Sequence, residues 1–176
     1  MKERQLFTNY LKNQRNFQGA SLHQANLEGL NLQRINLSRA DLSGANLKET
    51  DLSGACLAQA NLTDVDLTKA HLVGANLTEI NLIGADLTGA DLTGADLTKA
   101  DLRCANLHNA NLNKAKLQEV NLDGADLSGA KLCGATIVNT DLGVADTQEM
   151  SLDNTEQCES KESLSVTSAN WVSWAG

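Results

Sequence analysis

The chain contains 176 residues, of which 41% are hydrophobic and only two Phe, two Trp and one Tyr are aromatic, and it carries a formal net charge of −8. This composition supports one domain with an aliphatic core, and the acidic balance argues against direct nucleic acid binding, which requires a basic surface. No stretch approaches the roughly 18 apolar residues of a membrane span, and residues 1–15 lack the apolar region of a secretory signal. We therefore expect a soluble, cytoplasmic protein with no direct contact to nucleic acid or membrane.

The first segment, residues 1–15, is expected to form a helix that caps the rest of the chain. Its apolar residues have the spacing of one face of a short amphipathic helix, and they are Leu6, Phe7, Tyr10 and Leu11. Two alternatives are a frayed leader and a helix that recruits a partner.

Residues 16–145 are organised by leucine, which occupies every fifth position from Leu22 to Leu132, twenty-three times in succession. Ala lies two residues before the leucine in seventeen of these repeats, and Asn or Asp usually lies directly before it. A five-residue period fits neither the 3.6-residue period of a helix nor the two-residue period of a strand. It fits a chain that turns once per repeat, with the leucine and the residue two before it pointing inward. The predicted core includes Phe17, Leu22, Leu42, Leu62, Leu82, Leu87, Leu92, Leu97, Leu102, Leu122, Ile137 and Leu142.

Glycine follows the central residue by two positions in eleven repeats. The second middle residue of a type II turn has positive φ, a conformation that glycine adopts without steric cost. These glycines therefore predict the positions of the corners.

The run A-[DN]-L-x-x, most regular in GADLTGADLTGADLT at residues 84–98, resembles the pentapeptide-repeat proteins over about residues 16–145. The resemblance implies an all-β solenoid, a right-handed, four-sided β-helix with one pentapeptide per side and twenty residues per coil. The repeats of this chain correspond to about 6 to 7 coils, stacked on one another as in other solenoids. Similar chains are numerous in cyanobacteria.

The repeat weakens after Leu142, and residues 146–176 are expected to hold a degenerate last coil and an acidic, partly disordered tail. Both tryptophans, Trp171 and Trp174, lie near the end of this tail. They are interpreted as a cap docked on the last coil, as a motif for partner binding or self-association, or as part of a disordered remnant.

Four consecutive repeats carry an aspartate directly before the leucine: Asp86, Asp91, Asp96 and Asp101. Successive repeats lie on successive faces, so no two of these carboxylates can share an ion or act as an acid–base pair, which needs a common cleft. One interpretation is that the exchange of Asp and Asn along each face limits repulsion between stacked charges. The other is a functional acidic surface, which makes these four residues candidates for partner binding.

The remaining reactive side chains are also scattered. The histidines His23, His71 and His108 fall on three different faces, which excludes a shared metal site. Cys56, Cys104 and Cys133 also fall on three different faces, so none of the three can pair with another. The sequence contains no nucleophile beside a base and no glycine-rich loop that opens a helix. We therefore predict neither an enzyme nor a protein with a cofactor or metal.

The leading functional hypothesis is a non-catalytic protein–protein interaction or scaffold module with a protein partner, either a monomer or an end-to-end dimer. A second hypothesis comes from the resemblance, because some pentapeptide-repeat proteins imitate duplex DNA and inhibit or protect a type II topoisomerase such as gyrase. A third is a structural spacer without a dedicated partner.

Overall fold

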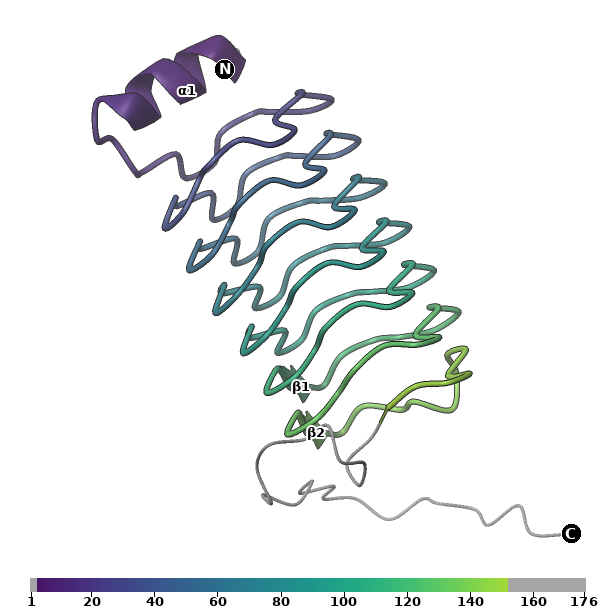
Figure 1. The fold of residues 1–176 in the computed structure, drawn as a ribbon. Helices are drawn as coiled ribbons and strands as arrows, with labels where there is room; N and C mark the ends of the chain where they lie inside the picture. The colour runs from purple at the N-terminus through teal and green to yellow at the C-terminus, as the bar shows by residue number, and fades with distance from the viewer. Residues whose placement is uncertain (1–2, 152–176) are drawn as a thin grey trace, which may run out of the picture.

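A computed structural model of the chain describes residues 3–151, which wind into a solenoid with a short helix at one end (Figure 1). Helix α1 spans Glu3–Leu11, and the two short strands β1 and β2 span Lys116–Gln118 and Thr136–Val138. No helix in this described part of the chain is long and apolar enough to cross a membrane.

The coils stack in parallel with a constant offset of twenty residues. The bridges begin with Asn16 beside Asn36 and continue to Lys131 beside Ser151, and strands β1 and β2 pair in the same register. Because each repeat contains five residues, each coil consists of four repeats, and the molecule has four sides. The period of the sequence therefore fixes which side chains lie above one another.

Backbone hydrogen bonds connect each repeat to both neighbouring coils. In the repeat centred on Leu42, the N–H groups of Leu42 and Gly44 donate to carbonyl oxygens of the following coil at 2.8 and 2.9 Å. The N–H of Asp41 donates to the preceding coil at 2.9 Å, and that of Ala45 donates back across the turn to the oxygen of Leu42 at 3.0 Å. Four of the five backbone donors in this repeat are thus satisfied by the backbone itself.

The leucines and the alanines two residues before them fill the interior. All the predicted core residues are buried except Leu142, which is only partly buried in the last described coil. Thr50 takes the place of an inner alanine and is the one buried polar residue among those described. Its hydroxyl donates to the carbonyl oxygen of Leu27 at 2.8 Å, which removes the cost of burying it.

The corners have the expected positive φ, but glycine is not required at all of them. Arg39, Gln59 and Glu79 adopt φ values of 59°, 60° and 56°, similar to the glycines at equivalent positions. Gly84 has an additional constraint, because a Cβ there would lie 2.5 Å from Oδ1 of Asp64, the corner residue of the preceding coil. Side chains at the corners therefore lean over the next coil, and glycine makes room for them.

Helix α1 lies against the first coil. Leu6 is fully buried and Tyr10 is buried, whereas Phe7 is half-buried. Leu11 is 69% exposed, so it does not contribute to the buried face that the sequence spacing predicts. The buried face of this nine-residue helix is narrower than expected because Leu11 is its last residue and the chain turns away immediately after it.

Tyr10 fixes the helix to the solenoid through three contacts. Its hydroxyl donates to the carbonyl oxygen of Gln33 at 3.0 Å. The Arg15 guanidinium lies 3.8 Å from the centre of the Tyr10 ring and donates to the Tyr10 carbonyl oxygen at 2.7 Å. This cation–π contact and the two hydrogen bonds set the position of α1 on the first coil.

We expect Leu87→Asp to prevent folding, because Leu87 is fully buried and the substitution places an unpaired charge in the leucine column. Lys69→Asp, the same new residue at an exposed corner, is the matched control and should fold. Circular dichroism and urea titration measure whether each of the two variants folds and how stable it is. A native-like Leu87→Asp protein would show that the interior tolerates a carboxylate.

Candidate functional site

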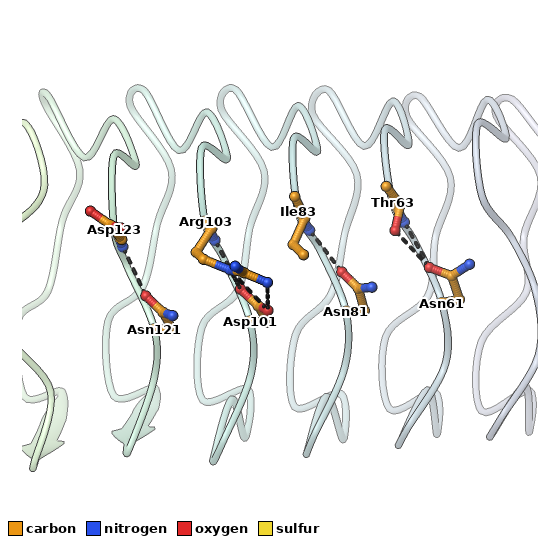
Figure 2. Close-up of polar contacts among 8 residues, drawn as sticks. All are labelled: Asn61, Thr63, Asn81, Ile83, Asp101, Arg103, Asn121 and Asp123. Carbon is orange, nitrogen blue, oxygen red and sulfur yellow. Dashed lines mark hydrogen bonds and ion pairs between the residues drawn. The ribbon is translucent and has the colours of Figure 1, made fainter.

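The fifth backbone donor of most repeats is satisfied by the Asn or Asp side chain that precedes the leucine. Figure 2 shows this contact in successive coils of one face: Asn81 Oδ1 accepts from the N–H of Ile83 at 3.1 Å, and Asn121 Oδ1 from that of Asp123 at 3.1 Å. Such side-chain caps are a property of Asn and Asp in turns. The backbone thus favours Asn or Asp at this position.

A serine or threonine two residues later often adds a second bond to the same oxygen. Asn61 Oδ1 accepts from the N–H of Thr63 at 3.3 Å and from its hydroxyl at 2.7 Å. The motif D-L-T or N-L-S therefore describes a closed local hydrogen-bonded unit. The Ser and Thr hydroxyls in these units donate to the cap oxygen, and this includes Ser43, which donates to Asp41 Oδ1 at 2.6 Å.

The four aspartates singled out in the sequence all serve as such caps. Asp86, Asp91 and Asp96 each accept from the N–H and the hydroxyl of a threonine two residues on, at 2.9–3.1 Å and 2.6 Å. Asp101 caps the N–H of Arg103 at 3.3 Å. The structure places these carboxylates on four successive faces and does not bring them together. Sequence reasoning missed the capping role, although the recurring Ser or Thr two residues later was a signal for it.

Two of these four aspartates also form ion pairs. Asp96 Oδ2 lies 3.1 Å from Lys116 Nζ, and Asp101 Oδ2 lies 2.8 Å from Arg103 Nη2. A third pair, Lys99 with Glu119, is longer at 3.8 Å. All are at the surface, where such pairs contribute little to stability, but they reduce the charge available to a ligand.

The caps lower the pKa of several aspartates. The hydroxyl and N–H of Ser43 hold the pKa of Asp41 below its ordinary value, because both donate to the charged form. The serine two residues after Asp126 lowers its pKa in the same way. The Arg103 guanidinium lowers the pKa of Asp101. These carboxylates are committed to the folded structure in their ionised form.

Histidines and cysteines form no site within residues 3–151. His23 Nδ1 lies 2.8 Å from the hydroxyl oxygen of Ser43 in the following coil. His108 Nδ1 lies at the same distance from the hydroxyl oxygen of Ser128 in the following coil. No group of three metal-binding side chains occurs in this part of the chain. Cys56 and Cys104 are both free thiols.

The charges are unevenly distributed over the four faces. We name the faces after one of their central residues, as the Leu42, Leu47, Leu52 and Leu57 faces. The turn that follows each repeat is counted as part of the same face. Through residue 151, the Leu42 face carries five aspartates and one arginine, and the Leu47 face seven acidic residues and two lysines. Their net charges are −4 and −5. The Leu52 face has a net charge of +1 and the Leu57 face is neutral.

The two acidic faces are adjacent because they are consecutive in the chain. Several of their acidic side chains are at turn positions and do not cap the backbone, namely Glu28, Glu49, Asp64, Asp123 and Glu149. Trp171 and Trp174, the other candidates for partner binding, lie outside the described residues. The acidic double face is thus the main candidate surface in the described part of the chain.

A parallel stack of five-residue turns around a leucine column defines a β-solenoid of the β-helix type. The sequence profile of the family described as Pentapeptide repeats matches this chain in eight copies. The matched ranges overlap and include residues 16–54, 45–82, 60–98, 80–118 and 110–143. The chain belongs to the pentapeptide repeat family, as its sequence indicated. No curated protein matches the chain.

Solved structures of pentapeptide repeat proteins are similar to this chain. One from Nostoc PCC 7120 is 40% identical, with a TM-score of 0.54, over 57% of this chain and 80% of its own. One from the thylakoid lumen of Arabidopsis thaliana is 34% identical, with a TM-score of 0.44, and the match covers 51% of this chain and 66% of that protein. HetL, involved in heterocyst differentiation regulation in Nostoc sp. strain PCC 7120, is 29% identical, with a TM-score of 0.30, over 85% and 94%.

We expect the protein to lose stability below about pH 4. Because the folded pKa of Asp41 and Asp126 is lowered, the unfolded chain binds more protons in this range. The contribution of these two aspartates to the free energy of unfolding is complete above the ordinary aspartate pKa of about 3.9. It is lost as the pH falls through their lower pKa in the folded protein. Urea midpoints measured from pH 6 to pH 2 test this. The double variant Asp41→Asn/Asp126→Asn keeps both cap oxygens but cannot titrate at these positions, so its urea midpoint should fall less between pH 6 and pH 2. An equal fall in the variant and the unchanged protein would contradict the role of these two aspartates.

Proposed function

We propose that this protein is a non-catalytic module that binds another protein through its two adjacent acidic faces. The observation that carries the proposal is the difference between net charges of −4 and −5 on the Leu42 and Leu47 faces and of +1 and 0 on the other two. An uneven field of this kind steers a partner of opposite charge toward one side of the molecule. The partner should therefore present a basic, nearly flat surface.

A rigid scaffold supports this function. The backbone bonds between coils hold the outward side chains at a spacing of about 4.8 Å along each face. The turn residues Glu49, Asp64 and Asp123 project from this framework without a capping role. Binding would then order few backbone groups, which limits the entropy cost of association.

The polar groups of the described surface support the absence of catalysis. Several of the Ser and Thr hydroxyls donate to capping oxygens, as Thr63 does to Asn61. The pKa values of Asp41 and Asp101 are lowered by their donors, which is the wrong direction for a general acid at neutral pH.

We also infer that the rod is right-handed, has about 6 to 7 coils and is closed at its N-terminal end by α1. Crossovers between parallel strands are right-handed in almost all proteins. The complete burial of Leu6 supports a capping role for the helix, and terminal caps are a common requirement of solenoids.

The test compares two variants that each remove two negative charges. Glu49→Gln/Asp123→Asn lies on the acidic faces, and Glu79→Gln/Glu119→Gln lies on the neutral Leu57 face. Affinity capture from the native cell identifies the partner, and titration at two salt concentrations measures its affinity. We expect about a three- to tenfold loss of affinity, and a weaker salt dependence, for the first variant only. Equal losses for both variants would refute the role of the acidic faces.

The same acidic faces favour a second candidate, a mimic of duplex DNA that binds a type II topoisomerase. Lys48, Lys69 and Arg103 interrupt the acidic surface and count against it. A gyrase supercoiling assay at micromolar protein separates the two: inhibition or protection supports the mimic. If no partner is captured and gyrase is unaffected, the spacer interpretation remains.

A further inference from the structure

Within residues 3–151, the two ends of the solenoid differ in how completely the core is buried. At the N-terminal end, α1 buries Leu6 completely. In the last described coil, Leu142, Ala145 and Met150 are only partly buried, and Val144 is 43% exposed. The inner positions one coil earlier, Leu122, Ala125 and Ala130, are at most 2% exposed, whereas Gly124, the corner residue one coil before Val144, is itself exposed.

The last turn also differs in geometry from the corners of the preceding coils. Val144 lacks the positive φ of the other corner residues. Gly124 donates to the carbonyl oxygen of Val144 at 3.0 Å, although the pattern of the preceding coils would place the acceptor one residue earlier. The turn is therefore displaced, and an apolar end surface lies at the C-terminal side of the described coils. We call Leu142, Val144, Ala145 and Met150 the apolar end.

The chain itself continues from this end for 25 residues, 152–176, which lie outside the described part. All of the charged side chains in this segment occur between Asp153 and Glu162. The final 14 residues, 163–176, carry none and contain both tryptophans. A charged linker followed by an uncharged, tryptophan-bearing terminus has the composition needed to place an apolar segment against an apolar surface.

The length of the linker permits this contact. Ser151 pairs with Lys131 at the last bridge of the described solenoid. Twenty residues separate Ser151 from Trp171, and an extended chain covers up to about 3.3 Å per residue. The tryptophans can therefore return to any part of a coil that is itself formed by twenty residues.

We propose that Trp171 and Trp174 fold back within the same chain and cover the apolar end. Each tryptophan can bury about 150–250 Å², and the coverage makes the C-terminal end equivalent to the end that α1 closes. Closure of both ends suppresses end-to-end association, which open solenoids favour. The contact does not require the charges of the acidic faces or the partner proposed for them.

Tryptophan fluorescence of the full-length protein tests the proposal, because Trp171 and Trp174 are the only two tryptophans. We expect emission that is blue-shifted and protected from acrylamide relative to the urea-unfolded chain, and that is independent of protein concentration. Emission equal to that of the unfolded chain would overturn the proposal. A blue shift that disappears on dilution would also overturn it, because it would assign the apolar end to a second copy.

Two matched variants identify the surface that the tryptophans contact. Val144→Asp should shift the emission toward that of the unfolded chain while circular dichroism is retained. Val73→Asp, at a residue 39% exposed on the Leu52 face, should leave the emission unchanged. An equal effect of both variants, or of neither, contradicts docking at the apolar end. If Val144→Asp does not fold, Trp171→Ser/Trp174→Ser provides the test, since it should increase binding of an apolar dye by the folded protein.

Discussion

Every pentapeptide must satisfy five backbone N–H groups while it turns a corner, and this requirement governs the structure. Bonds to the following coil, a bond to the preceding coil and the bond across the turn account for four donors, as in the repeat of Leu42. The Asn or Asp side chain accounts for the fifth. Since an unpaired donor is costly where water cannot reach it, Asn or Asp is favoured before the leucine, although Cys56, His71 and Lys116 show that other residues are tolerated there.

This constraint separates two kinds of carboxylate on the same surface. Those before the leucine, such as Asp41, are bound to the backbone and contribute to folding. Those at the turns, such as Asp123, contribute charge without a capping role. Asn can replace Asp in the first group because only an acceptor oxygen is needed. The charge of a face is therefore set by exchanges that leave the backbone bonds intact, and neighbouring faces of one rod can differ strongly.

The periodicity of leucine predicted the core and the corners, because both follow from a repeat that is longer than any local preference, whereas the stacking of residues twenty apart was expected from the resemblance to pentapeptide-repeat proteins. The capping role of Asp86 and its neighbours was not predicted, because it depends on a hydrogen bond that only the folded turn creates. Helical spacing could not identify Leu11 as exposed, since the direction of the chain after α1 decides it. Periodicity alone also does not indicate how completely Leu142 is covered, because Leu142 lies in the last described coil, where the repeat weakens.

The offset of twenty residues has a consequence for how such a chain can diverge. Duplication of one pentapeptide would leave the leucine column unchanged, but it would rotate everything downstream by a quarter turn. Side chains that are now aligned on one side would move to the neighbouring side, and a new arrangement of surface charge would arise in a single genetic event. Only the gain or loss of a complete coil would preserve the original alignment.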